Sequence, residues 1–353
     1  MDKFRIDSHK LMYHPQRVAD WQNNKLIYPI YMEISPAGAC NHRCVFCSVD
    51  FMGYRNDFLD AQVLKNRITE LGQLGLKSIM FAGEGEPFLH RGLPDIITHT
   101  KTAGIDVAIT TNGVLMTPDI SEKILGSTEW IKISCNAGTP ETYAKIHRTK
   151  PSDFDRVMQN MAKAVEIRKT NGFSCTLGLQ IILLDQNSED VEKLAQTAKD
   201  IGVDYMVVKP YTFHPDNEHR YDIKYEAYSQ LDKQLKRFND QAFSVVFRRD
   251  TMQNWDRGER GYQRCYALSF WSYIDSRGNV WGCSSHLHND TFNFGNIQDK
   301  TFKQIWENPE RLEMLKKFEN EFDIKVCKYN CRMDKINQYL WDLENLPEHV
   351  NFI

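Results

Sequence analysis

Short apolar runs typical of β-strands alternate with segments of helical periodicity up to about residue 209. The runs predict strands at residues 30–35, 77–83, 106–110, 130–134, 176–184 and 204–209. Between them, apolar residues such as Leu64, Ile68 and Leu71 recur at the spacing of an amphipathic helix. Six β-α units in series imply a parallel sheet with right-handed crossovers. Because a closed (β/α)8 barrel needs eight strands, we expect an α/β fold in which six strands form a partial barrel.

The alternation of predicted strands and helices stops after the apolar run at 204–209, and the remaining chain is irregular and rich in aromatic residues. Its pattern predicts a helix near 223–239, a strand at 243–249, a β-hairpin at 272–283 that turns at Arg277 and Gly278, and a last helix near 333–343. A polar lead-in with a short helix at 15–22 precedes the first strand. We therefore expect a lead-in at 1–28, a barrel at 29–215, a linker at 216–260 and a smaller domain of hairpin and helices at 261–353.

Composition and charge narrow the functional classes. Of the 353 residues, 41% are hydrophobic, which is enough for a sizeable core. The net charge of -3 gives no broad cationic field, so nucleic-acid binding is not favoured. The first residues lack the apolar core of a secretory signal and no run approaches the length of a membrane span, so we expect a cytoplasmic protein. Nine cysteines in such a protein are expected to be metal ligands, catalytic thiols or buried side chains rather than disulfides.

Three of the cysteines, Cys40, Cys44 and Cys47, directly follow the first predicted strand. In parallel α/β folds the reactive site lies at the carboxyl ends of the strands. Three thiolates suit zinc or an iron–sulfur cluster and leave one coordination position open. A structural zinc site with His42 as the fourth ligand is the alternative. It is disfavoured because His42 lies between the cysteines, where its side chain would have to fold back.

Further motifs follow in the same order as the predicted strands. They are "GEGEP" at 83–87 after the second strand, "TTNG" at 110–113 after the third, and Ser134 with Asn136 after the fourth. Together with the spacing CxxxCxxC and the aromatic Phe46 inside it, they make the chain resemble the radical S-adenosylmethionine (radical SAM) superfamily. Glu84 departs from the glycine that many members carry at this position. Glycines allow backbone groups to approach a small zwitterion closely.

The resemblance implies a partial (β/α)6 barrel and a [4Fe–4S] cluster held by Cys40, Cys44 and Cys47, with S-adenosylmethionine (SAM) on the fourth iron. It also implies an electron donor of the flavodoxin or ferredoxin type, and reductive cleavage of SAM to a 5′-deoxyadenosyl radical that abstracts a hydrogen atom from the substrate. The implied SAM contacts are Phe46, Gly83, Glu84, Gly85, Glu86, Pro87, Thr111, Asn112, Ser134 and Asn136.

A second set of cysteines lies beyond the barrel at Cys265, Cys283, Cys327 and Cys331. The first two, with the glycine of the predicted hairpin turn between them, resemble the opening of the SPASM and twitch domains of radical SAM enzymes. A full SPASM domain uses seven cysteines for two clusters, so four imply a twitch-like domain with one auxiliary [4Fe–4S] cluster ligated by all four. A four-thiolate zinc site, buried unliganded cysteines and incomplete ligation are the alternatives.

The two remaining cysteines, Cys135 and Cys175, are expected to pack in the core. Cys135 lies between Ser134 and Asn136, so strand alternation turns it away from the side that would face SAM. The alternative for Cys135 is delivery of a hydrogen atom, as thiols do in radical epimerases.

Substrate contacts are expected from the ends of the fifth and sixth strands and the linker, and the candidates are Lys209, Tyr211, His214 and Arg220. About thirty residues before the first strand cannot hold a leader-binding module, so the sequence favours a small polyhydroxylated or sugar-like substrate. In an oxidation of such a substrate, the auxiliary cluster would be a physically sensible electron acceptor. A radical SAM peptide maturase is the alternative. A noncatalytic iron–sulfur carrier would not need the glycine motifs, and an RNA-modifying enzyme would need a basic surface.

Overall fold

The computed structural model describes residues 3–218 and 220–352, and its ten strands form one continuous sheet in the order β10-β9-β8-β1-β2-β3-β4-β5-β6-β7. The strands are β1 (Tyr31–Ile34), β2 (Ser78–Phe81), β3 (Asp106–Thr111), β4 (Trp130–Ser134), β5 (Thr176–Leu183), β6 (Tyr205–Pro210), β7 (Ser244–Phe247), β8 (Trp271–Ile274), β9 (Asn279–Trp281) and β10 (Asn293–Asn296). All six strands predicted for the barrel are present.

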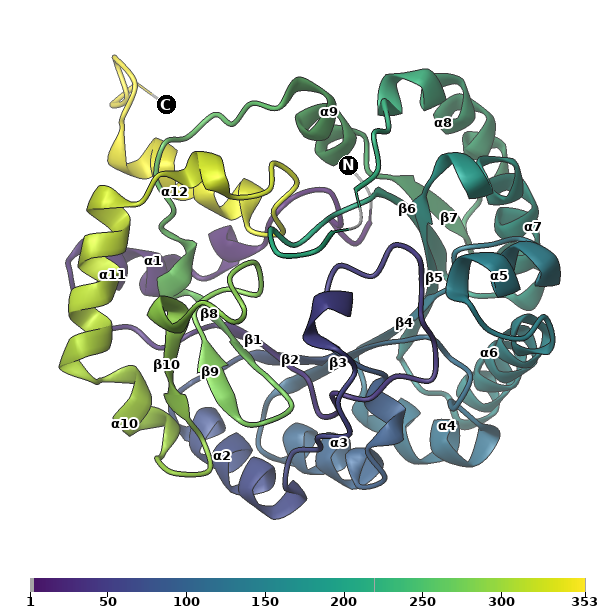
Figure 1. Ribbon diagram of the computed structural model, residues 1–353, viewed down its shortest axis with the longest axis horizontal. Helices are drawn as coiled ribbons and strands as arrows, with labels where there is room; N and C mark the ends of the chain where they lie inside the picture. Colours follow the sequence, from purple (N-terminus) through teal and green to yellow (C-terminus); the bar gives the residue numbers. More distant parts are fainter. Residues whose placement is uncertain (1–2, 219, 353) are drawn as a thin grey trace.

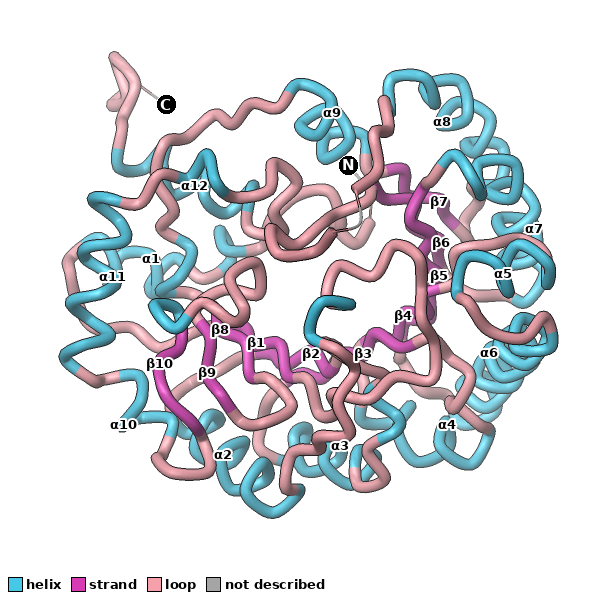
Figure 2. The backbone as a smooth tube through the Cα atoms, viewed as in Figure 1, coloured by secondary structure: helices cyan, strands magenta, loops and turns pink. Residues whose placement is uncertain are grey.

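Strands β1 to β7 pair in chain order and are all parallel. Figure 2 shows them as an open arc with helices around its outside. This is the expected partial barrel, but it is extended by one strand, because the run predicted at 243–249 pairs with β6 as a seventh parallel strand. On the other edge, β8 pairs in parallel with β1, so the hairpin of β8 and β9 continues the barrel sheet.

Most of the helices follow the convex side of the arc, whereas α9 and α12 lie at its open side (Figure 1). They are α1 (Pro15–Gln22), α2 (Ala61–Gln73), α3 (Leu93–Thr102), α4 (Pro118–Ile124), α5 (Pro140–His147), α6 (Ser152–Asn171), α7 (Val191–Ile201), α8 (Ser229–Leu235), α9 (Arg249–Arg257), α10 (Phe302–Trp306), α11 (Pro309–Glu321) and α12 (Asp334–Glu344). Helix α2 begins where the Asp60 side chain accepts hydrogen bonds from the N–H groups of Gln62 and Val63, which satisfies donors at the helix start. No helix in the described ranges is long and apolar enough to cross a bilayer.

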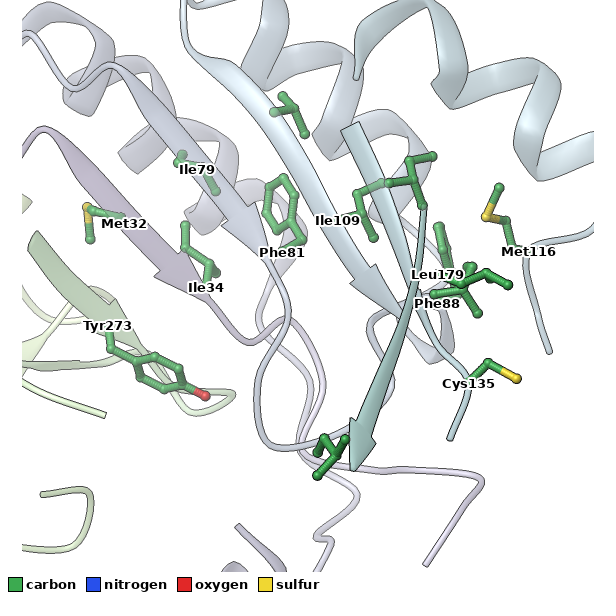
Figure 3. Packing of buried hydrophobic residues seen from close by; sticks show 14 of the residues in the cluster. Met32, Ile34, Ile79, Phe81, Phe88, Ile109, Met116, Cys135, Leu179 and Tyr273 are labelled. Atoms are coloured by element: carbon green, nitrogen blue, oxygen red, sulfur yellow. The ribbon is translucent and has the colours of Figure 1, made fainter. Parts of the chain in front are cut away.

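The strand register divides the sheet into two faces. The outer face is apolar and almost fully buried, with Met32, Ile79, Ile109 and Leu179 packed in one large core cluster (Figure 3). The alternate positions face the inside of the arc, because successive side chains of a strand point to opposite sides. This inner face carries polar residues such as Glu33, Lys132, Ser134, Gln180 and Lys209. The barrel interior therefore combines these polar side chains with apolar patches, one around Met80 and Ala108 and another around Tyr205 and Val207.

Candidate active site

The thiols of Cys40, Cys44 and Cys47 lie on the loop that follows β1, at the carboxyl end of the barrel strands. Burial raises the pKa of each thiol, and the neighbouring thiols raise the pKa of Cys44 further. The three sulfur atoms therefore lie close enough to repel one another when charged. The linker helps to hold this loop, because the Asn217 side chain donates a hydrogen bond to the Cys47 carbonyl oxygen at 2.6 Å and Tyr221 donates to that of Val45 at 3.1 Å.

The spacing of these sulfur atoms distinguishes a cluster from a single metal ion. Tetrahedral zinc with Zn–S bonds of about 2.3 Å would bring its sulfur ligands to within about 4 Å of one another. Among the described residues, no three cysteine Sγ atoms lie within 4.8 Å of one another. Sulfur atoms that each bind a different iron are necessarily further apart. The donor set thus fits an iron–sulfur cluster better than a lone zinc ion.

His42 and His147 both lie near Cys44, and the ligand atoms of the three residues are within 4.8 Å of one another. The His42 ring does fold back, against Tyr143 and His147, which is the conformation that the sequence argument required for it to approach a cysteine. However, this group contains only one of the three thiols. In addition, one ring nitrogen of His147 already accepts a backbone hydrogen bond, from Asn136 at 3.1 Å.

The 83–87 segment packs directly on the cysteine loop. The Glu86 N–H donates to the Ala39 carbonyl oxygen at 2.8 Å. A Cβ atom at Gly85 would lie 2.0 Å from that oxygen, and one at Gly83, where φ is +125°, would lie 2.4 Å from the Ser35 Cβ atom. Side chains cannot be accommodated at either position, so the two glycines are required for this close approach.

The Glu86 carboxylate joins the two glycine motifs. It accepts hydrogen bonds from the Thr111 hydroxyl at 2.5 Å and from the backbone N–H groups of Asn112 at 2.8 Å and Phe88 at 3.2 Å. Burial raises the pKa of Glu86, and these donors act against that rise. Pro87 begins a short 3-10 turn beside it. The carboxylate thus fixes the loops after β2 and β3 relative to each other.

Glu84, the departure from the usual glycine, turns toward the C-terminal hairpin. Its carboxylate accepts hydrogen bonds from the Ser276 N–H at 3.2 Å and the Ser276 hydroxyl at 2.8 Å. Burial raises the pKa of Glu84 to about 7, and the nearby Asp275 adds to the rise. Glu84, one of the expected SAM contacts, thus joins the barrel to the segment that carries the second cysteine set.

The other expected SAM contacts lie at the same end of the barrel. Asn112 donates from its side-chain amide to Asn41 at 2.6 Å, and Asn136 accepts from the Ile182 N–H at 2.6 Å. Phe46 packs edge-on to His147, and Ser134 lies in register with Gln180 on the inner face. Sequence reasoning missed Asn41, Gln180 and His147. The period-two register of β5 could have found Gln180, whereas no local signal pointed to His147.

The second cysteine set also converges. Burial raises the pKa of Cys265 well above its ordinary value, and the thiols of Cys331, Cys283 and Cys327 raise it further. The sulfur atoms are surrounded by donors, including the Asn337 amide at 3.5 Å from Cys265 and a ring nitrogen of His286 at 3.3 Å from Cys327. All four thiols are partly exposed rather than fully buried, and no three lie within 4.8 Å, which fits a cluster better than zinc or unliganded core cysteines.

Cys135 and Cys175 lie in the hydrophobic core, as expected, the former from strand alternation. Cys135 is fully buried, and its thiol donates to the Ala137 carbonyl oxygen at 3.5 Å. Burial raises the pKa of both thiols to about 12. Figure 3 shows Cys135 in the same core cluster as Leu179 and Phe88. The surroundings of both cysteines are those of packing residues.

The four candidate substrate residues fall into two groups. Lys209 lies on the inner face of β6, and the ring of His214 stacks on Phe51 with centroids 4.1 Å apart. Tyr211 is fully buried, and the Arg220 guanidinium stacks over Phe213 and bonds the carbonyl oxygens of the linker itself. The linker therefore uses Tyr211 and Arg220 for its own packing. Lys209 is half-buried on the inner face, and His214, although only 3% exposed, has one ring nitrogen without a hydrogen-bond partner among the described residues.

Sequence comparison agrees with this geometry. Residues 34–221 match the Radical SAM superfamily, and residues 265–332 match the iron-sulfur cluster-binding domain named SPASM. A probable GTP 3′,8-cyclase of Methanocaldococcus jannaschii is 26% identical over 226 residues, which cover 63% of this chain and 70% of that protein. The AdoMet-dependent heme synthase of Methanosarcina barkeri is 24% identical over 314 residues, which cover 82% and 86%. The chain spans only 55% of the GTP 3′,8-cyclase of Chlorobaculum tepidum, at 27% identity and over 52% of this chain.

Solved structures show the same fold. SuiB of Streptococcus suis bound to S-adenosylmethionine superposes with a TM-score of 0.66 at 16% identity, covering 86% of this chain and 72% of SuiB. The enzyme anSMEcpe with AdoMet and the Kp18Cys peptide gives a TM-score of 0.59 at 17% identity, covering 92% of this chain and all of the other. The two family matches indicate SAM, a SAM-binding [4Fe–4S] cluster and an auxiliary cluster as cofactors. Because the first match alone spans more than half of the residues, this chain belongs to the radical SAM superfamily, with a SPASM domain after the barrel.

Proposed function

We propose that the protein cleaves SAM reductively and uses the resulting 5′-deoxyadenosyl radical to abstract a hydrogen atom from a substrate inside the partial barrel. The observation that carries the proposal is the contact between the cysteine loop and the 83–87 segment, where the Glu86 N–H reaches the Ala39 carbonyl oxygen at 2.8 Å. A reduced [4Fe–4S] cluster on Cys40, Cys44 and Cys47 would supply the electron for cleavage. The chain's own part is to place SAM beside that loop and to exclude water.

The residues proposed to hold SAM do so mainly with backbone groups. The close approach at Gly83 and Gly85 leaves carbonyl and N–H groups of the 83–87 segment unobstructed by side chains. The Glu86 carboxylate is occupied by Thr111 and Asn112, so its role is to fix the loop. Phe46, Ser134 and the motif residues already named complete the proposed site.

The second cysteine set is proposed to hold one [4Fe–4S] cluster ligated by all four thiols. An auxiliary cluster beside the barrel could accept the electron that a substrate radical loses on oxidation, which would make the reaction an oxidation. The proton released in such a step needs an acceptor, and this role is assigned to His214, whose Nε2 atom has no hydrogen-bond partner among the described residues. Burial and the neighbouring Lys328 lower the pKa of His214 to about 3, so it is uncharged at neutral pH.

A peptide is the proposed substrate class. The peptide-bound anSMEcpe and SuiB structures share the fold over most of this chain, which supports this class over the small polyhydroxylated molecule favoured by the sequence. That earlier preference rested on the short segment before the first strand, which does not bear on how much of a peptide the barrel can hold. The polar inner face, with Ser134, Gln180 and Lys209, keeps the small molecule as a second candidate.

The test is an anaerobic assay of the reconstituted protein with SAM and a strong reductant. We expect 5′-deoxyadenosine to form, and Cys40→Ala to abolish its formation, whereas Cys175→Ala, which alters a cysteine outside both sets, should retain it. Peptides and aminosugars deuterated at carbon then compete directly, since only the true substrate class passes deuterium into 5′-deoxyadenosine. Failure of the wild-type protein to form 5′-deoxyadenosine would refute the proposal.

A further inference from the structure

The inner face of the barrel carries basic side chains that neither cysteine set uses. Lys132 on β4 lies in register with Gly178, and Lys209 on β6 lies in register with Ile182. Their neighbours along each strand, such as Ile131 and Val208, are fully buried on the outer face. Because side chains alternate along a strand, both lysines must point into the arc, where they are shielded from bulk water but not sealed.

Further cationic side chains act on these two ammonium groups. The charges of Lys132, Arg248 and Lys328 all act on Lys209, and that of Arg248 acts on Lys132. Lys328 comes from the segment between Cys327 and Cys331, so the cationic group extends from the barrel wall to the auxiliary site. Burial lowers the pKa of Lys132 to about 8 and that of Lys209 well below its ordinary value.

Among the described residues, Arg248 is the one member of the cationic group with an acidic partner. Arg248 pairs with Asp7 at 3.2 Å. Within residues 3–218 and 220–352, no carboxylate oxygen lies within 4.0 Å of the ammonium nitrogen of Lys132, Lys209 or Lys328. Lys132 instead lies over the Trp130 ring, 5.2 Å from its centroid.

Unpaired like charges in a shielded interior cost stability, because desolvation and mutual repulsion both disfavour the charged forms. They are also unusual in a chain whose net charge is -3. A cleft lined by one sign of charge concentrates ligands of the opposite sign. An anionic ligand would supply the missing partners and would be held by charge-assisted hydrogen bonds.

We propose that the barrel interior binds an anionic group of the substrate, a phosphate or a carboxylate, through the ammonium groups of Lys132, Lys209 and Lys328. This inference rests on the proposed function for the placement of the substrate in the barrel, and it deepens that function by naming the substrate's charge. The anionic group of the substrate would be anchored on the β4 to β6 side of the barrel, beside the auxiliary site. The neutral part of the substrate would then lie toward the cysteine loop.

Two probes are used, pyrophosphate for a phosphate group and citrate for a carboxylate. Calorimetric titration into the anaerobically reconstituted protein, saturated with SAM so that the SAM carboxylate position is filled, should show binding of at least one of them. Lys132→Gln and Lys209→Gln should each weaken that binding about tenfold, the cost of one charged hydrogen bond. Lys123→Gln, on the exposed side of α4, is the matched control and should bind like the wild type.

The outcomes separate the two proposals. Preference for pyrophosphate would identify a phosphate group, and preference for citrate a carboxylate; both support the inference. Binding of neither probe, or equal binding by all four proteins, would overturn it, and thermal unfolding shows whether each variant is folded. SAM cleavage by the same wild-type preparation is measured independently of anion binding. If the protein cleaves SAM but binds neither anion, this inference alone is refuted. If it binds an anion but does not cleave SAM, the proposed function is refuted.

Discussion

His147 donates a hydrogen bond to the sulfur of Cys44, with its Nδ1 atom 3.1 Å from Sγ. The direction follows from the other ring nitrogen. Nε2 accepts a hydrogen bond from the Asn136 N–H at 3.1 Å, so in the neutral ring the proton is on Nδ1. Burial keeps the ring neutral, because it lowers the pKa of His147 well below its ordinary value. A residue on α5 thus contacts a proposed cluster ligand 103 positions away in the sequence.

The first prediction concerns the reduction potential of the SAM-binding cluster. Hydrogen bonds to cluster sulfurs stabilise the reduced, more negative state and raise the potential. Loss of one neutral hydrogen bond, about 0.5–1.5 kcal/mol, corresponds to about 20–60 mV for a one-electron couple. We expect His147→Leu to lower the potential by this amount in a redox titration followed by electron paramagnetic resonance.

Two controls separate this effect from simple misfolding. His147→Gln retains an N–H donor and should recover part of the shift, and iron content should equal that of the wild type. An unchanged potential in a fully loaded His147→Leu protein would show that the contact does not act on the cluster.

The second prediction concerns Gly85, where an added Cβ would lie 2.0 Å from the Ala39 carbonyl oxygen and 2.6 Å from that of Ala37. Both obstacles are backbone atoms, so the cysteine loop itself would have to move. We expect Gly85→Ala to reduce SAM affinity at least tenfold and to impair loading of the first cluster, measured by SAM titration and iron analysis. Gly172→Ala, at a helix end with open space around it, should leave both unchanged.

How much of the fold and of the candidate site can be predicted from the sequence depends on how far apart in the sequence the interacting residues are. The strands of the barrel follow from local apolar runs and were predicted correctly, and the three cysteines do follow β1, as their place in the sequence implied. The seventh strand was predicted as a strand but not as part of the barrel, because its pairing with β6 is a tertiary contact that no local pattern shows. The same holds for the contact of His147 with Cys44 and of Glu84 with Ser276, which no local pattern encodes.

The third prediction concerns the auxiliary site. If all four thiols of the second set hold one cluster, Cys265→Ala should lower the iron content from about eight to about four per chain. Cys175→Ala, which removes a core thiol, should retain about eight. Four irons in the wild-type protein with one equivalent of zinc would contradict the auxiliary cluster and favour a four-thiolate zinc site.

The fourth prediction uses the carboxylate that joins the barrel to the hairpin. Because the pKa of Glu84 is raised to about 7 in the folded protein, the folded state binds more protons than the unfolded state between about pH 4.5 and 7. The contribution of the protonated Glu84 carboxyl group to the free energy of unfolding is therefore present in acid and is lost as the pH rises through 7. Glu84→Gln keeps an oxygen acceptor for Ser276 without the buried charge. It should raise the free energy of unfolding by about 2 kcal/mol at pH 8 and by little at pH 5.

Thermal unfolding at the two pH values measures this difference, and Glu122→Gln on the exposed side of α4 is the matched control. The control should show no pH-dependent difference from the wild type. A Glu84→Gln protein that is less stable than the wild type at pH 8 would mean that the charged carboxylate stabilises the contact with Ser276.

The last prediction concerns the stability cost of the cationic barrel interior. Because burial lowers the pKa of Lys132 to about 8, the unfolded state binds more protons than the folded state between about pH 8 and 10.5. The penalty is thus complete below pH 8 and is relieved as pH rises. Lys132→Met, which keeps the contact with Trp130, should unfold at a higher temperature than the wild type at pH 7, and the difference should shrink by pH 10. If the variant is instead less stable at pH 7, Lys132 has a stabilising partner, and its charge does not require a ligand.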